Sequence, residues 1–292
     1  MPTYDAKAAL PDGAPGPWGP SIPIRYDRRD VMLYAVGIGI ADLRYVYERD
    51  PGFAVFPTFA IRWGSAGVPY DRALIPDSPG PLNIDAERYL EFVAPLPLEG
   101  EVQVRSRLIA AHPRGKGNGF VETESEVVDA AGRVCVRMVS GSFRRGISAL
   151  GDIAPFEGSG ATRSTKIDMP GRAPDLDLSV RIADNQAHLY RLSGDYNPLH
   201  IEPAAAKFGG FDRPILHGLC TFGHCAQTLL GALCGGAPTR FGRIRVRFAS
   251  PVYPGDTLRI HAWRDGPGRV VFNALVGDTV VVSNAFFEYQ EV

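Results

Sequence analysis

One short segment of this 292-residue sequence combines a carboxylate with an imidazole. In the segment 194–200, GDYNPLH, Asp195 and His200 are five positions apart. Gly194 and Pro198 interrupt regular helix there, because glycine has a freely variable backbone and proline lacks an amide hydrogen. We therefore expect an irregular loop that holds Asp195 and His200 as a general acid–base pair.

A second segment, 214–218 (PILHG), leads into an apolar helical pattern. The pattern begins at His217 and continues to about Leu233, with one stripe of large apolar residues at spacings of three and four. The first amides of a helix have no partner within it, so the N–H of Gly218 is available to bind an anion. The two segments together predict acid–base chemistry beside an oxyanion site. The apolar stripe consists of Leu219, Phe222, Ala226, Leu229 and Leu233.

Composition excludes several classes of protein. The net charge of −1 gives no reason to expect binding to nucleic acid or to an anionic membrane surface. No run of about 18 apolar residues predicts a transmembrane helix. The N-terminal segment lacks the pattern of a signal peptide, and the last residues carry no peroxisomal address. The four cysteines form no C-x-x-C pair, so we expect small buried thiols and a cytoplasmic protein.

The first half of the chain changes from helical to strand-like patterns. Residues 1–20 are rich in proline, glycine and alanine and predict an irregular arm. A short helix at 28–36 is predicted to begin at an Asp27 cap, and the apolar segment 57–66 predicts a buried helix. Strands are expected from 102 onward, over 120–129 and over 134–143, and the glycine-rich segment 115–119 predicts a hairpin turn.

The second half repeats the first. Tyr190 follows Tyr34 by 156 positions, and FVAP at 92–95 matches FASP at 248–251 with the same offset. VSGSF at 139–143 also resembles VSNAF at 282–286. We therefore predict an α+β fold with two tandem copies of a sheet wrapped around a helix. The predicted boundaries are 21–145 for the first domain, 146–175 for a linker and 176–292 for the second domain. In the second copy we expect a short helix at 184–192 and strands at 243–248, 257–263, 269–276 and 279–288.

Two further groups of residues leave alternatives open. Arg243, Arg245 and Arg247 alternate with apolar residues, so they share one face of a strand. That face is either solvated or a seat for a phosphorylated ligand. His200, His217 and His224 lack cysteine or carboxylate ligands at the usual spacing of a zinc site, so no metal site is expected. We expect His217 to be structural.

The long segments around Asp195 and Gly218 resemble a known family. YRLSGDYNPLHIEP and GGFDRPILHGLCTFG closely resemble the signature of the (R)-specific enoyl-CoA hydratases, the hydratase 2 or MaoC-like dehydratase family. Within that family, the two segments resemble the hydratase portion of peroxisomal multifunctional enzyme type 2. RDVMLYAVGIG, FPTF and RFASPVYPGDTL extend the resemblance over nearly the whole chain. It implies a tandem double hot-dog fold, each half an antiparallel sheet around a central helix.

The resemblance also implies the reaction. Water adds reversibly, in syn geometry, across trans-2-enoyl-CoA to give (3R)-3-hydroxyacyl-CoA, in fatty acid metabolism and β-oxidation. It implies that Asp195 and His200 hold the water, that Asn197 orients them, and that the Gly218 amide binds the thioester oxygen. The first half has Gly39 where the second has Asp195, so it would accommodate the acyl chain. No cofactor beyond the CoA of the substrate is implied, and relatives suggest a homodimer.

Substrate contacts are implied at further positions. Lys116 matches a lysine that the family uses against CoA, and Phe248 matches a substrate-contacting aromatic residue. Where the family has Leu-His-Gly-Glu-Gln, the segment 82–86 reads LNIDA, so Asn83 and Ile84 change the pocket wall. Other open functions are a hydratase or dehydratase on carrier-protein or branched thioesters, a thioesterase, and a non-catalytic acyl-CoA-binding subunit. The remaining implied contacts are Tyr196, Pro198, Leu199 and Arg247.

Overall fold

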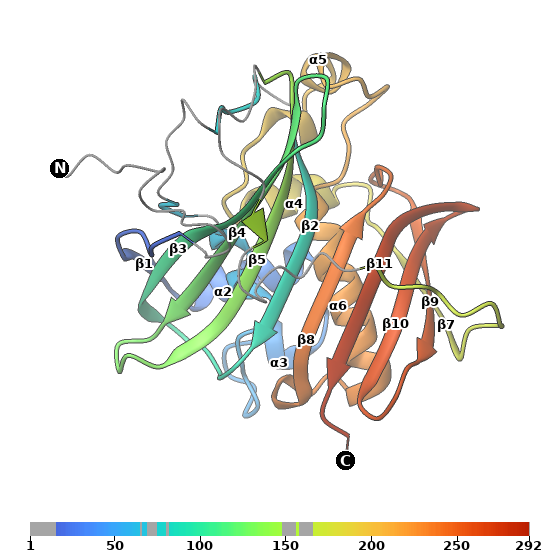
Figure 1. Cartoon of the computed structure of the whole chain (residues 1–292). Helices are drawn as coiled ribbons and strands as arrows, with labels where there is room; N and C mark the ends of the chain where they lie inside the picture. The colour runs from blue at the N-terminus through green and yellow to red at the C-terminus, as the bar shows by residue number, and fades with distance from the viewer. Residues whose placement is uncertain are drawn as a thin grey trace.

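Most strands of the computed structural model belong to one long antiparallel sheet (Figure 1). The structure describes residues 16–64, 66–68, 75–79, 82–147, 156–157 and 166–291. The sheet order is β1-β3-β4-β5-β2-β8-β11-β10-β9-β7, and β6 pairs with β3. The strands are β1 (Ile22–Tyr26), β2 (Asn83–Phe92), β3 (Gly100–Pro113), β4 (Asn118–Val128), β5 (Val134–Arg145), β6 (Phe156–Glu157), β7 (Leu176–Arg181), β8 (Phe241–Phe248), β9 (Thr257–Arg264), β10 (Arg269–Val276) and β11 (Thr279–Tyr289).

The sheet order confirms the internal repeat. The first half runs β1-β3-β4-β5-β2 and the second runs β7-β9-β10-β11-β8, which is the same order of equivalent strands. β2 and β8 are the equivalent strands that meet, and they pair antiparallel with Glu87 opposite Arg247 and Leu90 opposite Ile244. Their last residues, Phe92 and Phe248, are 156 positions apart. Two copies of one motif therefore join edge to edge into a continuous sheet.

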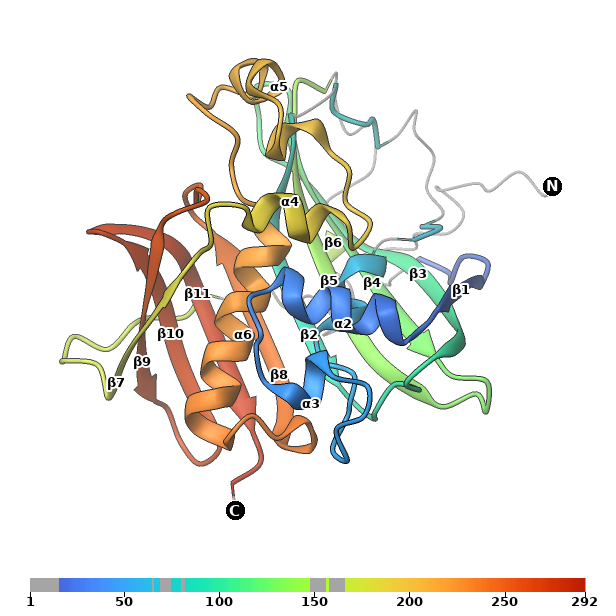
Figure 2. The same ribbon diagram turned by 180° about the vertical axis from the view of Figure 1, so that it is seen from behind.

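The helices lie on one face of this sheet (Figure 2). α6 (Gly218–Cys234) spans the second half, where its predicted stripe packs against the strands, and it ends at Gly235 in the left-handed conformation that favours glycine. The apolar face of the helix and the inner sheet face bury each other from water, which is the main stabilisation of this half. Phe222, Ala226 and Leu229 of the stripe are fully buried.

The first half has shorter helices. α2 (Arg28–Gly37) begins at the predicted Asp27 cap, which forms a reciprocal capping box with Asp30. The expected helix at 57–66 is only the 3-10 helix η1 (Phe59–Trp63), because the segment contains proline, β-branched and aromatic residues and ends at a glycine. The other helical segments are α3 (Leu43–Val46), α4 (Gln186–Arg191), η3 (Pro198–His200), α5 (Pro203–Phe208) and η4 (Pro238–Arg240).

The two halves also contact each other through the helical layer. Tyr34 on α2 and Tyr190 on α4, the pair related by the repeat, lie with ring centroids 6.2 Å apart. The Tyr34 hydroxyl shares a hydrogen bond of 2.8 Å with Thr58. Gln186 donates to the carbonyl oxygen of Gly37 at 2.6 Å, which connects α4 with the end of α2. The equivalent helices therefore pack together above the seam between β2 and β8.

The three alternating arginines of β8 all form ion pairs, and the side chains of Arg243 and Arg247 remain 44% exposed, as the solvated alternative expects. They lie on the outer sheet face, and each pairs with a carboxylate of a neighbouring strand. Arg243 pairs with Glu288 of β11, whereas Arg245 and Arg247 both pair with Glu87 of β2. Arg245 is only 1% exposed. Arg245 and Arg247 therefore connect the two halves across the seam between β2 and β8.

Three strands carry no clear strand pattern in the sequence. β2, β1 and β7 were absent from the strands expected above, and β2 is the most informative because NIDAERYLEF contains four charged residues. Its outer-face charges are neutralised by partners from other strands, so its polarity reflects long-range ion pairs. Residues 1–15 of the predicted N-terminal arm lie outside the described residues. In the described part of the arm, the backbone amides of Gly16 and Gly19 donate hydrogen bonds to carbonyl oxygens of β3. β6 falls within the predicted linker.

In the described residues, none of the helices has the length and apolar character needed to cross a membrane. Cys135, Cys220, Cys225 and Cys234 are buried free thiols, as expected.

Candidate active site

The loop after α4 holds Asp195 and His200 through local hydrogen bonds. Gly194 has a φ of 118°, which allows the chain to turn sharply out of the helix. The Asp195 carboxylate accepts from the Asn197 amide at 3.2 Å, and the Asn197 side-chain oxygen accepts from the Leu199 amide at 3.1 Å. This second bond caps η3, whose last residue is the buried His200. Asn197 therefore fixes the geometry between Asp195 and His200.

The hydrogen bonding of His200 defines which ring nitrogen is basic. Its Nδ1 lies 2.9 Å from the carbonyl oxygen of Ile215. A carbonyl only accepts, so Nδ1 carries the hydrogen in the neutral ring and Nε2 retains its lone pair. Burial lowers the pKa of His200, although the Ile215 carbonyl and Asp195 partly oppose this effect. His200 is therefore neutral near pH 7 and can take a proton at Nε2.

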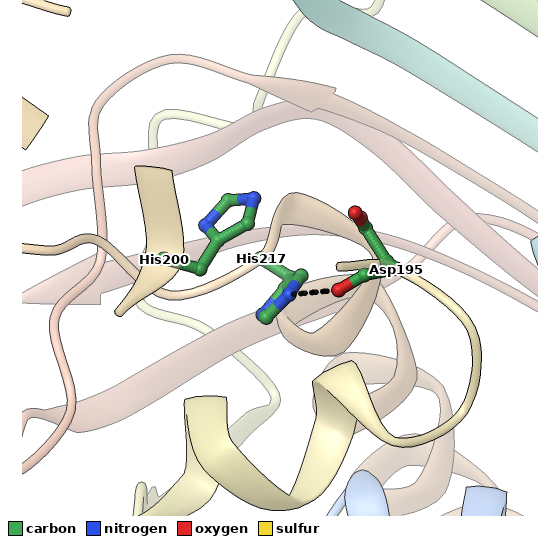
Figure 3. A group of neighbouring side chains, drawn as sticks. All are labelled: Asp195, His200 and His217. Carbon is green, nitrogen blue, oxygen red and sulfur yellow. Dashed lines mark hydrogen bonds between the residues drawn. The ribbon is translucent and has the colours of Figure 1, made fainter. Parts of the chain in front are cut away.

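His217 contacts both of these residues (Figure 3). Its ring stacks on His200 with centroids 3.7 Å apart, and its Nε2 donates to the backbone carbonyl of Asp195 at 3.2 Å. Tyr190 packs against it with ring centroids 4.9 Å apart. Burial, followed by the neighbouring His200, lowers the pKa of His217 to about 4, so the ring is neutral. The structural role predicted for His217 thus consists of holding the loop and the imidazole in place.

Gly218 provides the amide nearest to this group. It is the first residue of α6, and the first amides of the helix to bond back along the chain are those of Cys220 and Thr221, both to the His217 carbonyl at 3.1 Å. The amide of Gly218 precedes those bonds and is available for a ligand oxygen. A Cβ at this position would lie 3.3 Å from the ring of Phe248, so glycine keeps the approach open.

A cavity of about 590 Å³ joins these residues with the first half of the chain. Its lining contains Asp195, Asn197, Leu199, His200, Gly218 and Phe248 from the second half, together with Asn83 and Ile84 from β2. The sequence therefore predicted eight residues that the fold brings to one cavity. This volume is within the usual range for small-molecule sites.

Four predicted contact residues lie outside this lining. Tyr196 is 58% exposed and stacks on the guanidinium of Arg191, and Pro198 begins η3. Arg247 pairs with Glu87 on the outer sheet face. Lys116 occupies the predicted turn between β3 and β4 with a φ of 50°.

A basic rim extends from Lys116 to the cavity. The turn places Lys116 two residues before Asn118, which pairs with Arg145 on β5, and Arg145 lines the cavity. Within the described residues, neither Lys116 nor Arg145 forms an ion pair with a carboxylate. The sequence indicated Lys116 but not Arg145, because only strand pairing shows that the two are neighbours.

Two more charged residues of the cavity were not predicted. Asp85 and Arg88 of β2 form an ion pair in the lining, with the Arg88 Nε 2.9 Å from each carboxylate oxygen. A bulge at Ala86 adds one residue to β2 between its pairings with Ser142 and Gly141. A bulge changes the face of the sheet to which the following side chains point. Without it, strand alternation would place Asp85 and Arg88 on opposite faces. Burial raises the pKa of Asp85, which Arg88 opposes.

Asp195, His200 and His217 also contain potential metal ligands within 4.8 Å of one another. The two rings are stacked with centroids 3.7 Å apart and an interplanar angle of 27°, so their lone pairs lie in separate, nearly parallel planes, which disfavours a shared metal ion. His224, the third histidine considered above, lies elsewhere on α6 against Gly39. The arrangement suits proton transfer to and from a water molecule better than metal coordination.

Comparison with known proteins identifies the family. Residues 24–146 match the MFE-2 hydratase 2 N-terminal domain, and residues 166–285 match the MaoC like domain. A probable enoyl-CoA hydratase 2 of Dictyostelium discoideum is 31% identical over 269 residues, covering 86% of this chain and 87% of that protein. The MaoC-like dehydratase structure from Phytophthora capsici superposes with a TM-score of 0.84 at 32% identity, covering 99% and 98% of the two chains.

The chain therefore belongs to the hydratase 2 branch of the MaoC-like family, with a double hot-dog fold. Members of this family are named enoyl-CoA hydratase 2, which is a hydratase, or hydro-lyase, activity. Peroxisomal multifunctional enzyme type 2 of Drosophila melanogaster is 35% identical over 277 residues, covering 90% of this chain. This chain spans 45% of the length of that relative.

Proposed function

We propose that this enzyme adds water to trans-2-enoyl-CoA and forms (3R)-3-hydroxyacyl-CoA, reversibly. The observation that carries the proposal is the convergence of three groups in one cavity. These are the basic Nε2 of His200, the carboxylate of Asp195 and the free amide of Gly218. Water activation needs a base, and the thioester needs a donor for its developing oxyanion.

The reaction follows from these positions. Asp195 and His200 hold the water, and one of them takes its proton while the water oxygen bonds to C3. The π electrons shift toward the thioester oxygen, where the Gly218 amide stabilises the negative charge. The same pair then returns a proton to C2. Because water and proton arrive from one side, the addition is syn. No cofactor is required beyond the CoA of the substrate.

The basic rim is our proposed seat for the CoA phosphates. Lys116 and Arg145 lie at the same end of the sheet, and Arg145 belongs to the cavity wall. Guanidinium and ammonium groups without a carboxylate partner are suited to phosphate groups. We further propose a homodimer in the cytoplasm. The buried free thiols favour a reducing compartment, and size measurement and cell fractionation would check these two points.

The decisive experiment is a hydration assay with chiral analysis of the product. Loss of the enoyl absorbance of crotonyl-CoA, with the 3R alcohol as product and full activity in EDTA, is the expected result. Carrier-protein-bound crotonate is the comparison substrate. An S product, or release of free CoA thiol without hydration, would contradict the proposal. Saturable binding without turnover would indicate an acyl-CoA-binding subunit instead.

A further inference from the structure

The cavity wall supplied by the first half is unusually polar for an acyl-binding surface. Ten residues of β2, β4 and β5 line the cavity, and all except Ile84 and Gly141 have polar or charged side chains. Four of the polar ones, one from β2, one from β4 and two from β5, surround the position where Arg88 and Thr123 both pair with Ser140. The shared property is hydrogen-bonding capacity, since one carries a guanidinium and three carry hydroxyl groups. Asp85 adds a carboxylate. The four residues are Arg88, Thr123, Ser140 and Ser142.

These residues share a cavity with the reaction centre, and Asp85 is close enough to Asp195 for the charge of one carboxylate to affect the other. Arg145 is the last residue of β5, and Ser140 is five residues earlier on the same strand. At about 3.3 Å per residue, the two are separated by about 17 Å. A thioester whose CoA phosphates bind near Arg145 would therefore bring its acyl group, which reacts at Asp195 and His200, against the wall around Ser140 and Arg88.

Near Ser140, the cavity wall contains an ion pair between Arg88 and Asp85. Arg88 binds both oxygens of Asp85 through Nε and binds the Ser140 hydroxyl through Nη1. Gly64 makes room for this arrangement, because a Cβ there would lie 2.9 Å from both Arg88 Nη1 and Ser140 Oγ. The side chains of Arg88 and Asp85 retain 14% and 29% exposure, and both residues line the cavity.

A methylene chain laid on this pair would displace its remaining water without supplying a hydrogen bond. Removing water from charged groups without compensation is unfavourable. In an apolar pocket, by contrast, each buried methylene increases affinity by about fourfold. We propose that the Asp85–Arg88 pair is a specificity determinant that makes this enzyme select short enoyl-CoA substrates over long alkyl ones. This inference rests on the hydratase function proposed above.

The first test is the selectivity of the natural enzyme. We expect kcat/KM for trans-2-decenoyl-CoA to be at least tenfold below that for crotonyl-CoA, with a progressive fall through the six- and eight-carbon substrates. Equal or rising values along the series would overturn the inference. Absence of hydration with every chain length would instead overturn the proposed function, so the two failures are distinguishable.

The second test removes both charges together, because a single substitution would leave the other charge without its partner. In Asp85→Val/Arg88→Met, the ratio of kcat/KM for the ten-carbon over the four-carbon substrate should rise at least tenfold. The control is Arg25→Gln/Glu101→Gln, an exposed ion pair of the same half, which should leave the ratio unchanged. A ratio that stays constant in a folded double variant would contradict the inference. If that variant fails to fold, the wild-type series still decides.

Discussion

Position 39 in the first half and position 195 in the second half are equivalent in the repeat, yet one is glycine and the other aspartate. Gly39 has a φ of 79°, and a Cβ there would lie 2.4 Å from Cε1 of His224. The central helix of the second half therefore occupies the space that an acid would need in the first. The comparison shows that one copy retains the acid–base pair while the other contributes packing and a substrate wall.

Substituting the acid–base residues of the second half should have the largest effect on kcat, and comparison with the equivalent first-half position tests whether only one half is catalytic. His200→Ala or Asp195→Ala should reduce kcat roughly 10²–10⁴-fold while the fold survives, as for lost general acid–base groups. Arg44→Ala changes the residue that the repeat places opposite His200 and should alter kcat by less than about twofold, since it adds no proton-transfer group. Initial rates with crotonyl-CoA give both values. Near-normal rates in either second-half variant would exclude the mechanism.

The seam between the halves offers the next largest effect. Glu87→Gln removes the carboxylate that pairs with the buried Arg245. Leaving one partner of a buried ion pair uncompensated should lower the free energy of unfolding by about 3–5 kcal/mol. Urea denaturation measures the change. Replacing both residues, as Glu87→Met/Arg245→Met, should recover most of the loss, and a single-variant loss below about 1 kcal/mol would show that this pair does not hold the halves together.

Acid should destabilise the second half through its buried histidines. Burial lowers the pKa of His217 and of His224 to about 4 from an ordinary 6.5. The unfolded chain then binds more protons between pH 6.5 and 4, so stability falls as the pH decreases through this window. Each group should contribute about 3 kcal/mol to that loss. His224→Met should flatten the pH dependence of the unfolding free energy, and an unchanged slope would contradict the assignment.

Gly39→Ala examines the first-half position directly. The substitution places a Cβ against the His224 ring at a backbone conformation that side chains rarely adopt. We expect a loss of about 2–3 kcal/mol of stability from strain and overpacking. Thermal and chemical unfolding measure it, and Gly132→Ala, at a turn with positive φ but open space, separates backbone strain from the collision. Equal losses in the two variants would mean that His224 does not limit this position.

The smallest expected effect concerns the support of the acid–base pair. His217→Phe keeps an aromatic ring beside His200 but removes the hydrogen bond to the Asp195 carbonyl. Loss of a hydrogen bond worth about 1.4 kcal/mol corresponds to about a tenfold decrease in kcat. KM should change by less than about twofold if His217 only positions the pair. An unchanged kcat would show that the loop is held without it.

Local sequence patterns predicted much of the second half well. The apolar stripe from Leu219 to Leu233 predicted α6, and alternation predicted β8 to β11, because helical and strand periodicities are local properties of the chain. The Asp27 cap and the turn at Lys116 were predicted for the same reason. The 156-residue offset predicted the internal repeat before any contact was known.

Other features depended on partners distant in the chain. The polar sequence of β2 did not indicate a central strand. Its Glu87 can occupy a central strand because Arg245 and Arg247, about 160 residues later, neutralise its charge. The segment 57–66 was expected to be a helix, yet packing allowed only the short η1. Local propensities cannot register these long-range constraints.

The sequence by itself determined the family, the repeat and the residues Asp195, His200 and Gly218, since these lie in short, strongly patterned segments. Only the tertiary structure showed which residues of the first half line the same cavity as these three. Strand pairing placed Arg145 beside Lys116, and the bulge at Ala86 directed Asp85 and Arg88 into one cavity wall. Register and bulges arise from the pairing of strands, and a one-residue change in pairing exchanges the faces of a sheet.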